Sequence, residues 1–420
     1  MIAPVPTRTF ERPRGWLGLL QTSAVLLAIS LPFAFRLIPV FILSIAVATI
    51  ALRMQERNGR WCRPRLDSAF FWMPLFYLLH VLGMAWTSNT SFGAFDLQVK
   101  ASFLVFPALG WVFPSRGMEP SKVFRTFAWA NAGAVVLCLL VAIWNFGHEY
   151  YLRAQGQLPA DPAWTNHFFE SRFALFLHPS YMAMYLCFAL ATVQQVGLGD
   201  RVASWVKWAV PGLLIVGVIL CNSKMGWLTV AVVIGGAMLN GWKDVGARKR
   251  LILLSGVGLG LFLAVFLAFP TVSGKLTQAI SATGAIDPAS DQSSALRRMV
   301  WDAATDLFRE HPLTGVGTGD IKDELIAVYQ EKGYVHAEAK RMNAHSQYLQ
   351  TAATLGILGL LVLVAMVLVP LYKAYQDRDR YALVFWLIIA LNWSVESMAE
   401  VQAGVLFAAF IAWVLRAGRA

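Results

Sequence analysis

Long apolar runs recur along this chain, and they constrain its fold more than any other feature. A helix needs about 20 apolar residues to cross the hydrocarbon core of a bilayer, and the sequence offers twelve such runs. They cover residues 15–34, 36–52, 68–86, 94–114, 121–146, 178–197, 204–221, 225–241, 250–269, 346–370, 381–397 and 401–416. Because a membrane-spanning segment must satisfy its own backbone hydrogen bonds, the pattern predicts an all-α polytopic membrane protein with about twelve transmembrane helices.

The composition excludes an ordinary soluble protein. Hydrophobic residues make up 57% of the chain and charged residues only 14%, whereas soluble domains carry about 25% charged residues. So few charges cannot cover a surface that faces water on all sides. A surface that faces lipid does not need them.

The 35 Lys and Arg residues outnumber the 24 Asp and Glu residues and leave a net charge of +11. Such an excess suits nucleic acid, anionic lipid or a topology signal, and its distribution decides between them. With the N-terminus in the cytoplasm, the inner loops carry 22 of the 35 cations, and the short outer loop WTSNTSFG carries none. The positive-inside rule therefore predicts that both termini are cytoplasmic, and no nucleic-acid partner is needed.

Two outer segments are too long to be simple turns. The first is a medium loop at about 147–177, within a region 1–269 that holds the first nine helices. The second, 270–345, is an outer loop subdomain, and 346–420 holds the last three helices.

The outer subdomain contains two predicted amphipathic helices. SSALRRMVWDAATDLFREHP has one apolar stripe, and we expect Ser293 or Ser294 to cap its start and Pro312 to end it. DIKDELIAVYQEKG predicts a second helix that lies across the membrane face.

Charges at the depth of a membrane are costly and are functional candidates by default. A small set lies near the predicted outer boundary: Asp96, Lys100, Arg172, His178, Lys224, Arg297, Arg298, His345, Glu396 and Glu400. Their common depth predicts one cavity at the outer membrane–water boundary.

His345 is the strongest single candidate. It stands in RMNAHSQYLQTAATLGILGLL, where a polar segment turns into an apolar helix. A histidine can accept a proton near neutral pH, which suits a general base for a hydroxyl nucleophile. The alternative is a helix-capping or interfacial histidine without chemistry.

The cations suit a clamp for a phosphate or diphosphate, since Arg offers bidentate donors and Lys a point charge. Each also has a plainer interpretation. Arg297 and Arg298 can face water on an amphipathic helix, and Lys100 can pair with Asp96 four residues earlier. Lys224 stands in an outer turn, where the positive-inside rule disfavours it. GVGTG lacks the Lys and Ser/Thr of a phosphate-binding loop, so a tight turn is favoured.

No metal site is expected on the outer side. The one pair of aspartates with the spacing of a divalent-cation motif, Asp377 and Asp379, falls in an inner loop. The remaining histidines show no metal-ligand spacing. We therefore expect neither a metal nor another cofactor.

Four blocks of sequence are similar to a known family. RRMVWDAATDLFREHPLTGVGTGD, followed by NAHSQYLQTAATLGILGLL, resembles the signature of the O-antigen ligase and polymerase superfamily. HPSYMAMYLCFAL and SKMGWLTV resemble its two upstream blocks, so the similarity covers about 170–360. The resemblance implies a GT-C-type glycosyltransferase of the bacterial inner membrane. Such an enzyme takes a glycan from undecaprenyl diphosphate and transfers it on the periplasmic side.

The resemblance also implies roles for single residues. The catalytic histidine of the family corresponds to His345, and its loop arginine to Arg297, with Arg298 as the near alternative. The family's Ser-Arg pair appears here as Ser223-Lys224, which keeps the charge but loses the bidentate fork. The candidates for diphosphate binding are Arg297, Arg298, Lys224, Arg172 and Lys100.

Three activities remain open within this superfamily. A ligase, which we favour, delivers an O-antigen from its undecaprenyl-diphosphate-linked donor to lipid A–core. A polymerase delivers it to another O-unit, and a third kind of relative delivers it to protein hydroxyls. A flippase for lipid-linked sugars is the alternative of another class, but a transporter should place its charges near the membrane midplane.

Overall fold

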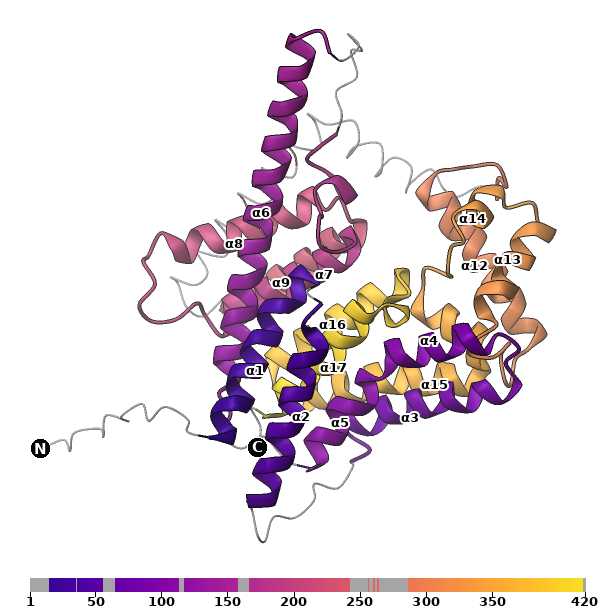
Figure 1. The fold of residues 1–420 in the computed structure, drawn as a ribbon, viewed down its shortest axis with the longest axis horizontal. Helices are drawn as coiled ribbons and strands as arrows, with labels where there is room; N and C mark the ends of the chain where they lie inside the picture. Colours follow the sequence, from indigo (N-terminus) through magenta and orange to yellow (C-terminus); the bar gives the residue numbers. More distant parts are fainter. Residues whose placement is uncertain are drawn as a thin grey trace, which may run out of the picture.

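The computed structural model describes residues 15–34, 36–55, 65–112, 117–157, 166–241 and 286–417, together with the single positions 256, 260 and 263. Within these residues the fold is helical and contains no strand (Figure 1).

The helices before residue 242 form most of the apolar bundle. They are α1 (Trp16–Ser30), η1 (Leu31–Phe33), α2 (Ile38–Gln55), α3 (Ala69–Gly83), η2 (Met84–Trp86), α4 (Thr90–Lys100), α5 (Ser102–Val112), α6 (Pro120–Ala154), η3 (Glu170–Arg172), α7 (Pro179–Gln195), α8 (Val206–Leu220) and α9 (Lys224–Gly241).

The described helices after residue 242 form the outer subdomain and complete the bundle. They are α12 (Ser293–Glu310), α13 (Ile321–Glu331), α14 (Val335–Ala339), α15 (Gln347–Gln376), α16 (Arg380–Val395), η4 (Met398–Glu400) and α17 (Gln402–Ala417).

Six described segments are long and apolar enough to cross a membrane: Trp16–Phe33, Ile38–Gln55, Ala69–Trp86, Thr90–Val112, Pro120–Ala154 and Gln347–Gln376. Four shorter apolar helices accompany them, at Val206–Leu220, Lys224–Ala237, Arg380–Val395 and Gln402–Ala417. The chain is therefore an all-helical protein of the polytopic membrane type.

Eleven of the twelve predicted spans coincide with helices in the described residues, and the ninth, 250–269, lies almost wholly outside them. The details differ in three places. The span expected at 94–114 is two helices, α4 and α5, divided at Ala101. The helix expected to end at 146 runs on to Ala154 and projects beyond the rest of the bundle in Figure 1. The expected serine cap of α12 is wrong, because Gln292 occupies the N-cap without a side-chain bond.

Local capping explains where several helices begin. The Ser68 hydroxyl accepts a hydrogen bond from Phe70 N at the start of α3, and the Asp379 carboxylate accepts one from Ala382 N at the start of α16. These side chains satisfy backbone donors that the first helical turn leaves unpaired.

The helix ends lie in two layers, one on each side of the bundle, and contacts between ends show which of them share a layer. In one layer, Gln21 near the start of α1 exchanges hydrogen bonds with the backbone of Glu119, which precedes α6. Arg416, near the end of α17, lies 4.7 Å from the ring centroid of Phe70, near the start of α3. In the opposite layer, Ser180 near the start of α7 contacts Glu396 at the end of α16. The start of α3 therefore lies beside the end of α17, and the start of α7 beside the end of α16.

An aromatic core joins α6, α7 and α17 beneath the second layer. Tyr185 stacks on Phe407 with ring centroids 4.6 Å apart, and Phe127 packs against both. The Tyr185 hydroxyl also donates to Ala403 O at 2.8 Å. Aromatic pairs and a satisfied hydroxyl make this contact rigid, so α7 and α17 have a fixed separation.

The outer subdomain consists of α12, α13 and α14, which lie together in orange at one side of Figure 1. The apolar stripe predicted for α12 is confirmed as buried: Leu296, Met299, Val300, Ala303 and Leu307. Lys332, after α13, bonds to Asp302 and Asp306 on the other face of α12. The amphipathic pattern thus packs this small domain internally.

The GVGTGD segment attaches the subdomain to the bundle. Val316 N and Gly317 N donate to Ala353 O and Thr354 O of α15, at 2.9 and 3.0 Å. Gly315 has a φ of +65°, and a Cβ there would stand 2.3 Å from Thr354 C. Only glycine fits this close approach, so the predicted tight turn is a docking contact.

Candidate active site

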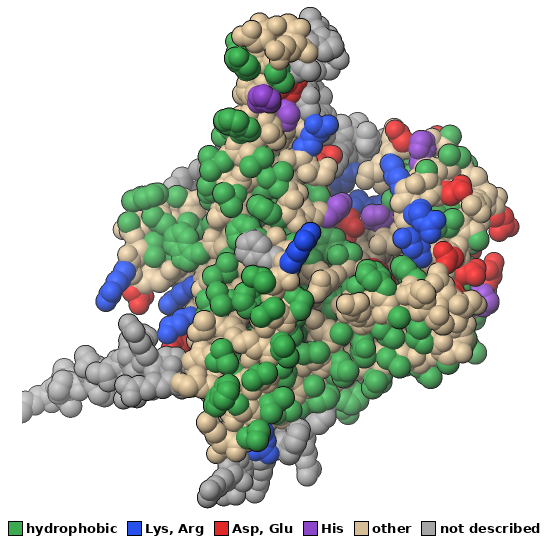
Figure 2. Space-filling model, in the orientation of Figure 1, with side chains coloured by type: hydrophobic (Ala, Val, Ile, Leu, Met, Phe, Trp, Pro, Cys, Tyr) green, Lys and Arg blue, Asp and Glu red, His purple; other side chains and the backbone are tan. Residues whose placement is uncertain are grey.

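A cavity of about 210 Å³ lies in the second layer of helix ends. Its lining residues are Glu170, Ser171, His178, Pro179, Ser180, Cys221, Asn222, Ser223, Lys224, Ser293, Arg297, His345 and Glu396. Figure 2 shows histidine and charged side chains gathered in the hollow between the bundle and the outer subdomain, above a largely hydrophobic surface. The cavity therefore brings together residues from segments that are far apart in the sequence.

His345 and Glu396 form the centre of this site. His345 Nδ1 lies 3.0 Å from Glu396 Oε2. In the neutral imidazole this contact places the proton on Nδ1, which donates to the carboxylate, and leaves a lone pair on Nε2. A carboxylate that orients a histidine in this way is the arrangement of a general base.

Glu396 is bound from two further sides. Arg297 Nη2 donates to its Oε1 at 2.8 Å, and Ser180 Oγ donates to the same oxygen at 3.1 Å. Glu396 lies beyond the last residue of α16, and its burial alone would raise its pKa. The hydrogen bond from His345 and the charges of His345, Arg297 and His178 lower that pKa from 4.5 to about 2. Glu396 is therefore ionised at neutral pH.

The backbone at His345 is held in an uncommon conformation. Its φ is +43°, in the left-handed region that non-glycine residues rarely adopt. Asn343 Oδ1 accepts from His345 N at 3.0 Å, and Trp301 Nε1 donates to His345 O at 3.3 Å. These two contacts hold the peptide groups before and after His345. The orientation of the imidazole is therefore fixed by tertiary contacts and not by a helix.

Two more lining residues share this backbone feature. Glu170 has a φ of +62° and Asn222 a φ of +50°, and Asn222 Nδ2 donates to Glu170 Oε1 at 3.0 Å. Such strained residues cluster where function requires a particular geometry. Three of the six non-glycine residues with positive φ in the described chain line this one cavity.

Four helices begin at the cavity. Pro179, Lys224 and Ser293 are the first residues of α7, α9 and α12 and line it, and His345 precedes α15 by two residues. The N-terminus of a helix carries a partial positive charge and unpaired N–H donors. Together with Arg297 and Lys224, these ends make the cavity suited to an anion.

The structure places the five candidate diphosphate ligands in different surroundings. Arg297 and Lys224 line the cavity, Arg172 is exposed next to the lining residue Ser171, and Arg298 is half-buried outside the lining. Lys100 is fully buried elsewhere, with its ammonium group paired to two carboxylates of the chain itself. The alternative pairing of Lys100 with Asp96 is therefore present.

The cavity offers no metal-ligand set. Among the residues that the structure describes, no three His, Cys, Asp or Glu side chains lie close enough together to hold a metal ion. The acidic groups at the site, Glu170 and Glu396, are engaged by Asn222, Ser180, Arg297 and His345.

The structure brings the predicted residues His345 and Arg297 together at one cavity, and both contact Glu396, for which the sequence predicted no such contacts. The sequence placed Glu396 only among the charges near the outer boundary. The signal was present, because a lone acid at the end of an apolar helix requires a partner. The partner is 51 residues away in the chain, and spacing alone does not reveal such a contact.

Residues 210–364 match the profile of the protein family described as O-Antigen ligase. The matched range contains His345, Arg297 and Lys224 and ends before Glu396. A search of curated proteins found no match to the chain. The family match supports a glycan-transferring enzyme of the O-antigen ligase and polymerase superfamily.

Proposed function

We propose that this chain acts as a member of the O-antigen ligase and polymerase superfamily and is an O-antigen ligase of the bacterial inner membrane. It transfers a glycan from undecaprenyl diphosphate to a sugar hydroxyl of lipid A–core on the periplasmic face. The single observation that carries this proposal is the His345–Glu396 pair at a cavity whose lining also holds Arg297 and Lys224.

His345 is the general base of the reaction. Its Nε2 accepts the proton of the acceptor hydroxyl while the hydroxyl oxygen attacks the anomeric carbon of the donor. The bond from that carbon to the diphosphate oxygen breaks as the new glycosidic bond forms, and undecaprenyl diphosphate leaves as an anion. Attack from the face opposite the leaving group inverts the anomeric centre.

The leaving group gains negative charge in this step, and the cations of the cavity stabilise it. Arg297 donates Nη2 to Glu396, and its guanidinium has five N–H donors in all, so further donors serve the diphosphate. Lys224 adds a point charge, and the starts of α9 and α12 add backbone donors. Arg172 follows the lining residue Ser171 and can join this set, whereas Arg298 lies outside the lining. A diphosphate neutralised in this way needs no metal ion.

The two substrates reach the site from different directions. The donor is held in lipid by its undecaprenyl chain, and the acceptor is a sugar of lipid A–core, which projects into the periplasm. A site at the ends of apolar helices and beside a polar subdomain suits both. Both termini are then cytoplasmic, in keeping with the excess of cations in the predicted inner loops.

Deletion of the gene, followed by analysis of the lipopolysaccharide and of the lipid-linked glycans, tests the function. A ligase predicts lipid A–core without O-antigen, with undecaprenyl-linked glycan accumulating on the periplasmic side. Core that bears a single O-unit would instead identify a polymerase, and accumulation on the cytoplasmic side would identify a flippase. Complementation with wild-type protein should restore O-antigen, and His345→Ala at equal expression should not.

A further inference from the structure

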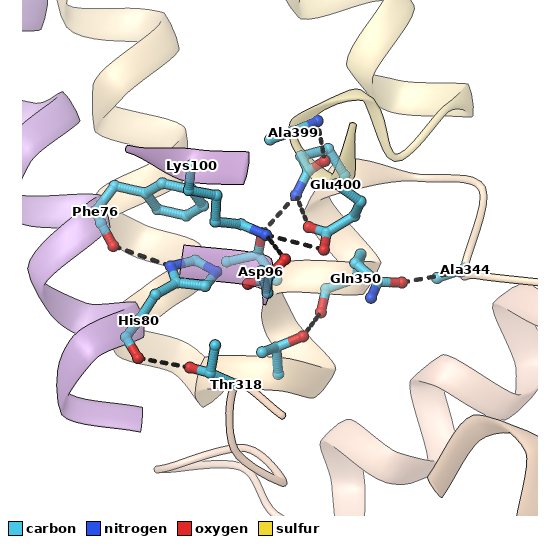
Figure 3. A network of polar contacts seen from close by, with 12 residues as sticks. Phe76, His80, Asp96, Lys100, Thr318, Ala344, Gln350, Ala399 and Glu400 are labelled. Atoms are coloured by element: carbon cyan, nitrogen blue, oxygen red, sulfur yellow. Dashed lines mark hydrogen bonds and ion pairs between the residues drawn. The ribbon is translucent and has the colours of Figure 1, made fainter. Parts of the chain in front are cut away.

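A second polar network lies next to the site, inside the apolar bundle (Figure 3). Its centre is Lys100, the last residue of α4, which is 0% exposed. The ammonium group binds Asp96, one turn earlier on the same helix, and Glu400 Oε2 at 2.9 Å, which belongs to η4. His80 of α3 lies beside Lys100, with its Nδ1 3.0 Å from Phe76 O.

Gln347, the first residue of α15, extends the network. Its Nε2 donates to Glu400 Oε1 at 2.9 Å, and its Oε1 accepts from Ala399 N at 2.7 Å. One amide side chain therefore contacts two consecutive residues of η4. Gln347 and Ala399 are buried and Glu400 is half-buried, so these hydrogen bonds are costly to lose.

The same two segments carry the candidate active site. His345 contacts Glu396, and Ser346 N donates to Ser397 Oγ at 3.2 Å. Residues 345–347 and 396–400 therefore run side by side with a hydrogen bond at every position of the first segment. The distance from His345 to Glu396 therefore depends on how these two hydrogen-bonded segments are aligned.

Glu400 is not required to neutralise Lys100. Asp96 already supplies one carboxylate from the same helix, so Glu400 gives the buried network one acid more than its single lysine balances. A surplus carboxylate that is largely shielded from water is costly unless other contacts compensate for its charge. Glu400, unlike Asp96, connects different elements. From η4 it binds Lys100 of α4 and Gln347 of α15.

We propose that Glu400, held by Lys100 and Gln347, is a positioning residue for the reaction. It fixes the segment 396–400 against the start of α15, so that the Glu396 carboxylate stays within hydrogen-bonding distance of His345 Nδ1. This assigns Lys100 to the geometry of the base instead of to the diphosphate. The inference rests on the proposed function.

Two variants with the same change in charge distinguish a role of Glu400 in positioning Glu396 from a role in neutralising Lys100. Glu400→Gln and Asp96→Asn each remove one carboxylate from the same lysine. In Glu400→Gln an NH2 group, which cannot accept, replaces one of the two carboxylate oxygens. Either the contact of Lys100 with Oε2 or that of Gln347 with Oε1 is therefore lost, and the paired segments loosen. In Asp96→Asn no contact to α15 or η4 is lost, since Asp96 binds Lys100 alone among the described residues.

The measurement is steady-state transfer by purified protein in liposomes, with an undecaprenyl-diphosphate-linked glycan as donor. Glu400→Gln should lower kcat by about 10- to 100-fold and leave the KM for the donor unchanged, because the base is misplaced while the diphosphate contacts remain. Asp96→Asn should stay within about twofold of wild type in both constants. Equal losses in the two variants, or a loss confined to KM, would overturn the proposal.

Hydrogen exchange of the backbone around 396–400 gives a readout that does not depend on activity. Exchange at Ala399 N should rise in Glu400→Gln and in Gln347→Leu but not in Asp96→Asn, with the folded fraction checked by size-exclusion chromatography. Unchanged exchange in Glu400→Gln would overturn the positioning role, whatever the activity. If wild-type protein transfers no lipid-linked glycan, the proposed function fails, and the exchange data still decide the inference.

Discussion

Glu396 accepts hydrogen bonds from Ser180 of α7, Arg297 of α12 and His345 before α15, and so joins three parts of the chain. Its two oxygens have different tasks. Oε2 contacts the imidazole of the proposed base, His345, whereas Oε1 accepts hydrogen bonds from Arg297 and Ser180. A substitution that keeps its shape and removes its charge should therefore affect catalysis more than folding.

Glu396→Gln should lower kcat by about 100-fold or more, because an amide in place of the carboxylate no longer fixes the imidazole tautomer or stabilises its charged form. The reconstituted transfer assay measures this change. Asn392→Leu is the control, since Asn392 is buried near the end of α16, four residues before Glu396, and its side chain donates to Thr229 and Ile388. A Glu396→Gln enzyme with wild-type kcat would contradict the orienting role.

The low pKa of Glu396 also predicts how stability depends on pH. Its pKa falls from 4.5 to about 2 in the folded protein, so the ionised group stabilises the fold above about pH 4.5, and this contribution is lost as the pH falls toward 2. Thermal unfolding in detergent from pH 3 to 8 should show a Tm difference between wild type and Glu396→Gln. That difference should be constant above about pH 5.5 and should shrink below about pH 4.5. A difference that grows on acidification would contradict the assigned pKa.

Among the single residues, sequence predicted best those whose neighbours in the chain carry the signal. His345 follows from its place between a polar segment and an apolar helix, and Arg297 from the motif around Trp301. Lys100 and Arg298 did not reach the cavity lining, because position on a membrane boundary says nothing about which way a side chain packs. Lys100 instead forms ion pairs with Asp96 of α4 and Glu400 of η4.

At the scale of elements, the outer subdomain depends on the turn at Gly315 for its placement against α15. Arg297 of α12 in this subdomain donates to Glu396. The docking contact therefore also determines where the Arg297 guanidinium lies in the site. Gly356 inside α15 has a φ of +65°, and a Cβ there would stand 2.3 Å from Leu313 O. Close backbone contact on both sides explains why glycine occupies both positions.

Gly315→Ala tests this contact, with Gly333→Ala as the matched control. Both glycines have a positive φ, +65° and +67°, but a Cβ at Gly333 meets nothing within 4 Å. Gly333→Ala should cost about 1–2 kcal/mol from backbone strain alone. Gly315→Ala should lower Tm further and should also lower kcat, because the subdomain shifts. Equal Tm losses in the two variants would contradict the docking role.

The helix pattern was predictable because each span needs its own apolar run, and eleven of the twelve are matched by helices in the described residues. Breaks within a run were not predictable. The division of α4 from α5 at Ala101 follows the buried ion pairs of Lys100, which hydropathy does not reveal. The extension of α6 to Ala154 reflects a polar continuation stabilised by the Glu149–Arg153 pair, at 2.7 Å.

For the whole molecule, the distribution of charge and the alternation of helix ends give one orientation. Among the described cations, Lys122 and Arg125 lie near Glu119 and Val196, in the layer opposite the site. We expect the site layer to face the periplasm.

Single cysteines in a background without native cysteines test the orientation. Asp291→Cys, before α12, should react with a membrane-impermeant maleimide in intact cells whose outer membrane has been opened. Gln376→Cys, at the end of α15, should react only after the inner membrane is permeabilised. Both residues are exposed. The reverse pattern would place the site in the cytoplasm and contradict the proposed donor.

The central claim is that His345 accepts the proton from an acceptor hydroxyl while a glycan leaves undecaprenyl diphosphate. Purified protein in liposomes, supplied with an undecaprenyl-diphosphate-linked glycan and lipid A–core, measures this transfer directly. Wild-type protein should form the product at an undiminished rate in EDTA, and His345→Ala should lower kcat by about 100- to 10,000-fold. Transfer by His345→Ala at the wild-type rate would contradict the claim.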